Sequence, residues 1–124
     1  MSDTAATNRA RIDAFYAALN ARDIEGVMDC YTDDAELEVL ALGPFGGKHR
    51  PSAELLGGLF DTFPVIAFEV RGVVMEGDRV AVEVRSEGED KQGAPYVNHY
   101  HNFFELRGGR IACFREYATG YTGA

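Results

Sequence analysis

The stretch that decides the fold is Ile12–Tyr31, IDAFYAALNARDIEGVMDCY. Apolar side chains recur in it twice at the spacing i, i+3, i+4, i+7, which places them on one face of a helix. The two sets are Ile12, Phe15, Tyr16 and Leu19, followed by Ile24, Val27, Met28 and Tyr31. Asn20–Arg22 ends the first set, and Asp23 has the side chain of a helix N-cap. The stretch therefore predicts two consecutive helices with a short turn between them.

The chain after these helices is predicted to break, form one strand and then loop. Thr32–Asp34 interrupts the helical pattern, because short polar side chains compete for backbone hydrogen bonds. Residues 35–41 alternate as a strand does. The side chains on its apolar face are Leu37, Val39 and Ala41. Gly43–Gly47, with the sequence GPFGG, has the composition of a loop.

A third helix is predicted from Pro51, because proline suits the first helical turn, where its missing N–H would be unpaired anyway. Its apolar residues are Leu55, Leu56, Leu59, Phe60 and Phe63. Gly57 and Gly58 lie in its middle, and each weakens a helix by about 1 kcal/mol relative to alanine. Close packing against a sheet is one reason for such glycines. Pro64 ends the helix.

The second half of the chain is predicted to be β-structure, because it is rich in β-branched and aromatic residues. The expected strands are Val65–Met75, Arg79–Glu87, Tyr96–Leu106 and Arg110–Tyr117. Short turns join them, so consecutive strands are expected to be antiparallel neighbours. Helices first and strands later indicate an α+β fold, with the helices gathered against one face of a curved antiparallel sheet. No repeat or linker divides the chain, so we expect residues 1–124 to form a single domain.

Composition excludes several classes of protein. The chain has 124 residues, of which 46% are hydrophobic, as in globular rather than disordered proteins. Its net charge of −8 has the wrong sign for a nucleic-acid binder, whose affinity comes largely from neutralising phosphates. No apolar run approaches the roughly 20 residues that span a bilayer, and no apolar signal core is seen near the N-terminus. Cys30 and Cys113 lack metal or redox spacing and are expected to be reduced thiols. We therefore expect a cytoplasmic protein with no nucleic-acid or membrane partner.

Four features of the chain carry a family resemblance: the order of elements, FYAALNARDIEGVM at 15–28, YTDDA at 31–35, and the ending from Gly109 to Tyr117. By these features the chain resembles the SnoaL-like group of the nuclear transport factor 2-like superfamily. The superfamily includes ketosteroid isomerase, limonene epoxide hydrolase, polyketide cyclases, dehydratases and non-enzymatic transport domains. It implies a cone-shaped, cystatin-like α+β barrel, in which three N-terminal helices close an apolar pocket inside the sheet. It also implies a homodimer, often made through the outer face of the sheet.

Glu116 is the first candidate catalytic residue. Phe114 and Glu116 share one face of the last predicted strand, so a charge lies beside a core residue. By resemblance, Glu116 stands at the catalytic aspartate of limonene epoxide hydrolase, within Arg115-Glu116-Tyr117. An apolar pocket raises the pKa of a carboxyl, which suits acid–base chemistry near neutral pH. The alternative is an exposed or ion-paired strand residue.

Arg85 is a second candidate, for binding. Arg85-Ser86-Glu87 repeats the arginine–any residue–aspartate spacing of the epoxide hydrolase, which implies that Arg85 holds a carboxylate network in the pocket. An alignment without gaps puts Glu83 and Arg85 there instead. The residues that alternate with these charges are Val80, Val82 and Val84. Periodicity favours the valines as the buried face, with the charges in water.

His99 and His101 lie two residues apart on a predicted strand and therefore share a face, which Phe103 continues. By resemblance, His101 stands at the oxyanion-stabilising aspartate of ketosteroid isomerase, where a histidine donates a hydrogen bond or shuttles a proton. A metal site with Glu116 as third ligand is an alternative, although histidine pairs for zinc are more typical at i, i+4 on a helix. The third interpretation is one histidine in a core network and one at a dimer interface.

Tyr16 matches, by resemblance, the tyrosine that stabilises the oxyanion in ketosteroid isomerase; the alternative is a core tyrosine with its hydroxyl at the rim. That isomerase carries its general base where this chain has Val39, and valine moves no proton. Glu38 is adjacent but points to the opposite side of the strand. Steroid isomerisation by that mechanism is therefore not expected.

Three functions remain at this stage. The favoured one is an enzyme that needs no cofactor or metal and performs acid–base chemistry on a small hydrophobic molecule: epoxide hydrolysis, cyclisation, isomerisation or dehydration. Glu116, His101 and Tyr16 would be catalytic. The residues expected to bind the substrate are His99, Arg85, Val39, Phe103, Phe114 and Phe60. The alternatives are a binding module that carries a hydrophobic ligand unchanged, and a dimerisation domain.

Overall fold

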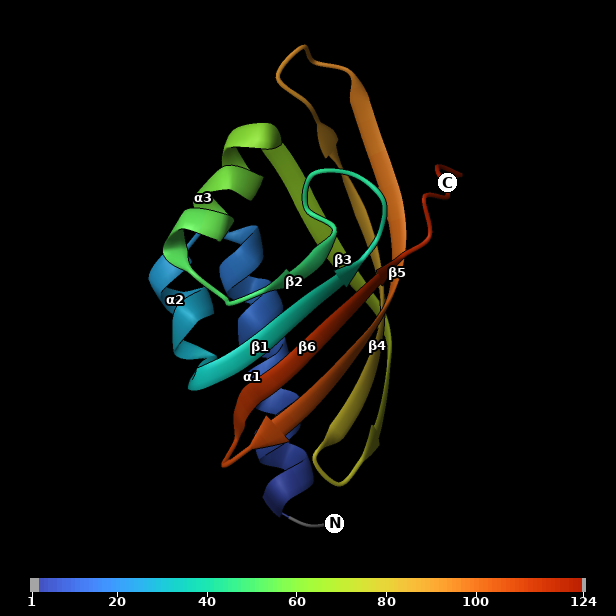
Figure 1. Ribbon diagram of the computed structural model, residues 1–124. Helices are drawn as coiled ribbons and strands as arrows, with labels where there is room; N and C mark the ends of the chain where they lie inside the picture. Colours follow the sequence, from blue (N-terminus) through green and yellow to red (C-terminus); the bar gives the residue numbers. More distant parts are fainter. Residues whose placement is uncertain (1–2, 124) are drawn as a thin grey trace.

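Two helices form at the two apolar sets of Ile12–Tyr31, although Tyr31 itself begins the first strand. The computed structural model describes residues 3–123, with α1 spanning Asp3–Asn20 and α2 spanning Ile24–Asp29 (Figure 1). Asp23 caps α2 as expected, since its Oδ1 accepts a hydrogen bond from the Gly26 N–H at 3.0 Å. Among the described residues, no helix has both the length and the apolar character needed to cross a membrane.

Arg22, in the turn between α1 and α2, ties both helices to α3 (Ala53–Thr62). Its guanidinium donates to the carbonyl oxygens of Phe60 and Phe63 at 2.6 and 3.1 Å, where the last turn of α3 leaves carbonyls unpaired. The guanidinium also lies over the Phe60 ring, 4.5 Å from its centroid. Arg22 therefore helps to fix the position of α3, together with the apolar side chains of α3 that pack against the core.

Six strands form one curved sheet, and the three helices lie against one of its faces (Figure 1). The strands are β1 (Tyr31–Leu40), β2 (Gly47–His49), β3 (Val65–Glu76), β4 (Arg79–Glu89), β5 (Pro95–Arg107) and β6 (Arg110–Ala118), in the order β2-β1-β6-β5-β4-β3. This confirms the α+β fold. One pair differs from the antiparallel expectation: β1 and β6 run parallel. A parallel pair needs a long connection, and residues 41–109 lie between these two strands.

Local boundaries differ from the sequence expectations at three points. β1 begins at Tyr31 rather than after the polar run, and its pairing with β6 shifts register between Tyr31 and Glu36, where Thr32–Asp34 lies. The short edge strand β2 was not predicted. Pro51 precedes α3 instead of opening it, because Ser52 is the N-cap, its Oγ accepting from the Leu55 N–H at 3.0 Å.

The concave face of the sheet carries the core. Val80, Val82 and Val84 of β4 are buried there, which confirms the interpretation that periodicity favoured. Phe15 of α1 lies at the centre, with its ring edge-on to four other rings. Those rings belong to Tyr16, Tyr31, Phe104 and Phe114.

The two glycines of α3 are not explained by close packing. A Cβ atom built at Gly57 or at Gly58 meets no heavy atom within 4 Å. We therefore expect Gly58→Ala, on the exposed side, to raise the free energy of unfolding by about 1 kcal/mol, since alanine restricts the unfolded backbone more. Thermal and urea unfolding measure this change. A destabilised variant would show that Gly58 serves a contact.

Gly88→Ala is the matched control. A Cβ at Gly88 would lie 2.0 Å from the Val65 carbonyl oxygen, so this substitution must displace backbone between β3 and β4. We expect it to lower the free energy of unfolding while Gly58→Ala raises it.

Candidate active site

A cavity of about 360 Å³ lies between the helices and the concave face of the sheet. Its walls are largely apolar and come from α1, α3, β1, β3 and the loop after β1. The apolar side chains of that lining include Leu19, Leu37, Val39, Ala41, Phe45, Leu55, Leu56, Leu59, Phe63, Ile66, Phe68 and Phe114. This size and character are typical of sites for small organic ligands.

Glu116 on β6 lines this cavity beside Phe114, on the face that alternation predicted. Burial alone raises the pKa of its carboxyl to about 7, because charge is costly in apolar surroundings. Among the described residues that line the cavity, Glu116 is the only Asp, Glu, Lys, Arg or His. The carboxyl therefore exchanges a proton near neutral pH without a counter-charge in the cavity.

Tyr16 and Asn102 form a buried polar pair in the same cavity. The Asn102 Nδ2 donates to the Tyr16 hydroxyl oxygen at 3.0 Å, and the two residues are only 2% and 4% exposed. Because the Tyr16 oxygen accepts this bond, its own hydrogen is free to donate. Asn102 is the strand partner of Glu116, and its Oδ1 is buried with no hydrogen-bond partner among the described residues. Burial raises the pKa of Tyr16, so the phenol stays protonated.

A second set of polar side chains lies along the first half of β5. The side chains of Tyr96, Asn98 and Tyr100 line the cavity, on the same face as Asn102. The Tyr100 hydroxyl lies 2.7 Å from the Ser86 Oγ and 3.3 Å from the Tyr96 hydroxyl. The Asn98 Nδ2 donates to the Tyr96 hydroxyl oxygen at 3.1 Å. Four of the polar side chains that line the cavity thus lie on one face of β5: Tyr96, Asn98, Tyr100 and Asn102.

The two histidines lie outside the cavity, so His101 and Glu116 do not come together there as expected. His101 is exposed and faces Glu83, while His99 bonds through Nε2 to the Gly123 carbonyl oxygen at 2.9 Å. Both lie on the convex face, because β5 pairs with β4 in the register that puts Asn102 beside buried Val82. The alternative metal set of His99, His101 and Glu116 is therefore not assembled.

Arg85 and Phe103 also lie on the convex face and do not line the cavity. Arg85 pairs with Glu87 at 2.8 Å on the charged face of β4. The Glu87 side chain is exposed, as periodicity predicted, whereas that of Arg85 is only 15% exposed, so the expectation that it lies in water is wrong. Phe103 is flanked by the guanidinium groups of Arg79 and Arg115, which lie 5.3 and 4.7 Å from its ring centroid. The structure does not support the roles in substrate binding expected for Arg85 and Phe103, because each side chain leaves its strand on the face opposite the cavity.

Of the other residues expected to bind substrate, Val39 and Phe114 line the cavity, whereas Phe60 packs beneath Arg22. The residues that sequence reasoning missed are Asn102, Tyr100, Tyr96 and Asn98. A signal for them was present, because they alternate with the histidines and one of these two faces had to be internal. Period-two alternation alone does not choose between two faces that both carry polar side chains.

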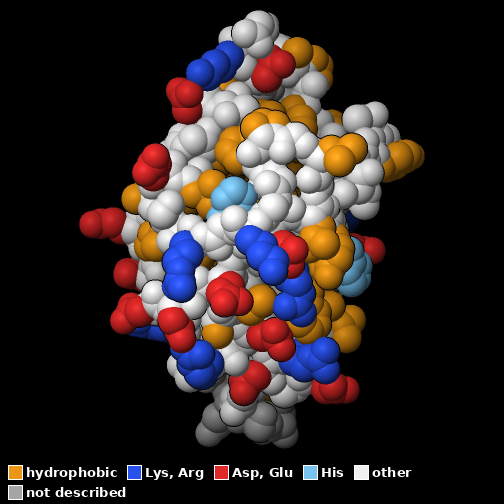
Figure 2. Space-filling model, viewed as in Figure 1, with side chains coloured by type: hydrophobic (Ala, Val, Ile, Leu, Met, Phe, Trp, Pro, Cys, Tyr) orange, Lys and Arg blue, Asp and Glu red, His pale blue; other side chains and the backbone are white. Residues whose placement is uncertain are grey.

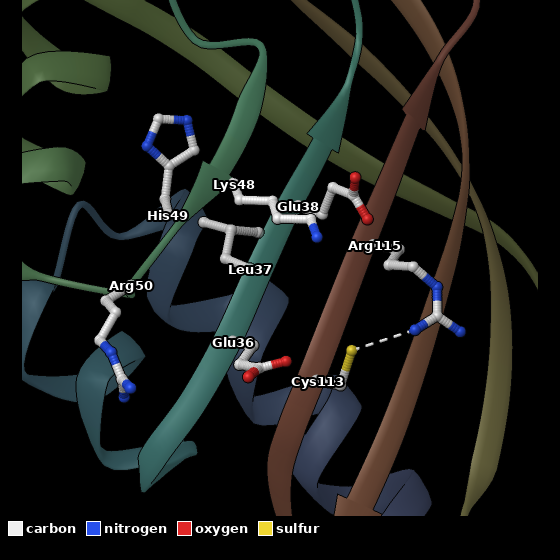
Figure 3. Close-up of a pocket in the computed structure, with 8 residues that line it drawn as sticks. All are labelled: Glu36, Leu37, Glu38, Lys48, His49, Arg50, Cys113 and Arg115. Atoms are coloured by element: carbon white, nitrogen blue, oxygen red, sulfur yellow. Dashed lines mark hydrogen bonds between the residues drawn. The ribbon is translucent and has the colours of Figure 1, made fainter.

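A second hollow lies on the convex face and differs in chemistry. It is bordered by Glu36, Leu37, Glu38, Lys48, His49, Arg50, Cys113 and Arg115 (Figure 3). Charges of both signs line it, and Figure 2 shows acidic and basic side chains interspersed over the lower half of this view of the molecule. The Cys113 thiol accepts from the Arg115 Nη1 at 3.2 Å, and burial raises its pKa, which keeps the thiol protonated. Neither an activated nucleophile nor one kind of ligand is indicated there.

Solved structures with the same fold span almost the full chain. TerC, co-crystallised with polyporic acid, is 23% identical and covers 89% of each chain at a TM-score of 0.79. An NTF2-like protein from Anabaena variabilis is 23% identical, covering 96% of this chain and 91% of its own, at 0.81. IdmH from Streptomyces antibioticus, described as a candidate polyketide cyclase, is 21% identical, covering 93% and 94%, at 0.78. These similarities establish the NTF2-like fold.

No curated protein matches the sequence. The family comparison is decisive, because one known domain family matches most of the chain, from the middle of α1 to the inward-facing phenylalanine of β6. The family is the SnoaL-like domain, which matches residues 12–114. The chain therefore belongs to the SnoaL-like domain family, within the NTF2-like fold.

Proposed function

We propose that this protein is an enzyme that moves a proton on a small, neutral, hydrophobic molecule, in an isomerisation or cyclisation. The observation that carries this proposal is the Glu116 carboxyl, whose pKa is about 7 in a cavity with no counter-charge among the described lining residues. A base is most effective when its pKa lies near the working pH. The catalytic residues we propose are Glu116 and Tyr16.

The proposed step begins with the ionised carboxylate. It takes a proton from a carbon next to a carbonyl group, and the electron pair of the broken C–H bond moves onto the carbonyl oxygen. Tyr16 donates a hydrogen bond to the resulting oxyanion, since its proton is not used by Asn102. The neutral Glu116 then returns the proton to another carbon. Alternatively, the enolate carbon forms a bond to a second carbonyl carbon, the electron pair of that C=O bond moves onto its oxygen, and this oxygen takes the proton from Glu116. No redox cofactor or metal is needed for this balance.

Two observations narrow the reaction. The arginine–glutamate pair that the epoxide hydrolase resemblance implied lies on the convex face, so a second acidic group to position water is missing from the described cavity lining. This favours proton transfer at carbon over epoxide opening. The same lining has no basic side chain, so an anionic substrate would meet Glu116 without a compensating cation. The substrate is therefore proposed to be neutral.

The homodimer and the cytoplasmic location expected from the sequence stay predictions. The outer sheet face is the surface that the family resemblance assigns to a dimer, and it exposes Tyr117 beside the Arg79–Phe103–Arg115 cluster. Such aromatic and arginine side chains are enriched where proteins associate.

A carrier that binds a hydrophobic ligand without chemistry is the second candidate. The apolar character of the walls favours it, because most of the lining serves only to exclude water. The two functions differ in one measurable respect. An enzyme accelerates exchange of an acidic C–H bond in its ligand, whereas a carrier binds the ligand and leaves that bond unchanged.

Glu116→Gln tests the proposal directly. The probe is 2-tetralone, a neutral two-ring ketone with exchangeable protons next to its carbonyl, incubated with protein in D₂O and followed by proton NMR. We expect the wild type to accelerate deuterium incorporation and the variant to lose about 100-fold or more, since a general base contributes about 10²–10⁴. Glutamine keeps the shape but accepts no proton.

Glu36→Gln is the matched control, because it removes an equal charge from an exposed position on the convex face. We expect its exchange rate to equal that of the wild type. Binding of 2-tetralone with no acceleration by the wild type would contradict the enzyme and support the carrier.

Tyr16→Phe separates oxyanion stabilisation from proton abstraction. We expect the exchange rate to fall roughly 10–100-fold, since one lost oxyanion donor costs up to about 10²–10³. The pH at which the rate levels off should stay near 7, because Glu116 remains. Tyr117→Phe, an exposed tyrosine on the convex face, is the control. An unchanged rate in Tyr16→Phe would show that the substrate oxygen lies elsewhere.

Glu116 also predicts how stability depends on pH. Between about pH 4.5 and pH 7 the folded protein holds a proton on Glu116 that the unfolded chain has released. The free energy of unfolding should therefore fall, through this group, as the pH rises across that window. Glu116→Gln lacks the effect, so above pH 7 it should be more stable than the wild type, by on the order of 3 kcal/mol, and equal to it below pH 4.5. Urea unfolding at a series of pH values measures the difference; equal stabilities above pH 7 would contradict the burial argument.

A further inference from the structure

The hydroxyl groups of Ser86, Tyr100 and Tyr96 form a chain that the proposed proton transfer does not use. The Tyr100 oxygen lies between the other two, at 2.7 Å from Ser86 and 3.3 Å from Tyr96. Asn98 adjoins the Tyr96 end. The chain is part of the cavity wall, because Tyr96, Asn98 and Tyr100 all line the cavity. Polar groups placed in an apolar site usually orient a ligand.

The orientation of the Asn98 amide is determined by the backbone. Its Oδ1 accepts from the N–H groups of His99 and Gly120, both at 2.9 Å. The Nδ2 therefore faces Tyr96 and donates to its hydroxyl oxygen at 3.1 Å. An oxygen that accepts from an amide has its own hydrogen left to donate.

The other end of the chain decides where the spare proton goes. Three hydroxyl groups have three hydrogens, and the two bonds between them use only two. Ser86 is 0% exposed, and among residues 3–123 its hydroxyl has no hydrogen-bond partner other than Tyr100. A spare hydrogen on Ser86 would therefore be buried without an acceptor, which costs about 1–3 kcal/mol. Tyr100 then accepts from Ser86. Burial raises the pKa of Tyr100, and the hydrogen bond with Tyr96 raises it further, as expected when Tyr100 is the donor in that bond. The favoured direction therefore runs from Ser86 to Tyr100 to Tyr96, and leaves the Tyr96 hydrogen for the cavity.

Tyr96 is placed to use that hydrogen. Its side chain is half-buried, and its ring packs on that of Phe63 at the end of α3, with centroids 4.3 Å apart. Its oxygen accepts from both Asn98 and Tyr100 in the favoured direction, and such chains polarise the last O–H group. The last O–H group is therefore a strong donor at a fixed place in the wall.

We propose that Tyr96 is a specificity-determining residue that donates a hydrogen bond to a second oxygen of the ligand, a carbonyl or ether oxygen remote from the reacting carbon. The ligand class is then a neutral, mostly apolar molecule with two oxygen functions. One oxygen lies at the Glu116–Tyr16 end, and the other meets Tyr96. Only the place of the first ligand oxygen rests on the proposed function. The place of the second oxygen rests on the hydroxyl chain, which is independent of the chemistry of Glu116.

The test compares two fluorescent probes that differ in one oxygen function. 2-Naphthol has a single hydroxyl, and 6-hydroxy-2-acetonaphthone adds a ketone at the far end of the same rings. We expect the wild type to bind the ketone probe about 3–10-fold more tightly, the ratio that one neutral hydrogen bond supplies. Tyr96→Phe should remove this preference and leave 2-naphthol binding unchanged. Tyr121→Phe, an exposed tyrosine, should leave both affinities unchanged.

Asn98→Asp is a second variant that leaves the Tyr96 hydroxyl in place. Its carboxylate still accepts from the two backbone N–H groups but no longer donates to Tyr96, whose hydrogen then turns toward the carboxylate. We expect the same selective loss of ketone binding, which a purely structural role of Tyr96 would not produce. An unchanged preference in both variants would overturn the inference.

The outcomes also separate this inference from the proposed function. Loss of ketone preference in Tyr96→Phe, together with unchanged 2-tetralone exchange in Glu116→Gln, would support the subsite and reject the enzyme. The reverse pair of results would reject the subsite and support the enzyme. If neither probe binds the wild type, both the subsite and a small-molecule function are rejected.

Discussion

The edge-to-face packing of Phe15 is the interaction on which the rest of the structure depends. From α1 it contacts rings on β1, β5 and β6, three adjacent strands. A curved sheet needs something on its concave face, and one aromatic side chain here holds the helix at a fixed depth. The next residue, Tyr16, is thereby placed with its hydroxyl against Asn102. The cavity begins where this packing stops.

The cavity itself reflects a balance between burial and chemistry. Apolar walls from α3, β1 and β3 exclude water, and they also deprive Glu116 of solvent. The pKa of the carboxyl is therefore raised to about 7, and no basic side chain of the described lining pairs with it. Such a group destabilises the fold when ionised, and buried carboxyls with a raised pKa are more typical of functional sites than of structural positions.

Polar groups in the cavity have two separate origins. Tyr16, Asn102 and Glu116 come from α1, β5 and β6 and meet through tertiary packing. The Ser86–Tyr100–Tyr96–Asn98 chain comes from β4 and β5 alone, and sheet register brings it together. Register is harder to perturb than a loop, which makes this second group a rigid reference point for a ligand. Mixed charge on the convex face, by contrast, does not extend into the cavity.

The sequence by itself determined the elements and their order apart from the short edge strand β2, because helical and strand periods, the Asp23 cap and the strand turns are local properties. It also determined the buried face of β4, where valines alternate with charges. Only the tertiary structure decided the face of β5, since both of its faces carry polar and aromatic residues. Pairing Val82 with Asn102 turned the asparagine inward and the histidines outward, because residues opposite one another in an antiparallel pair share a face. The depth of Glu116, and hence its pKa, likewise depends on helices far from it in the chain.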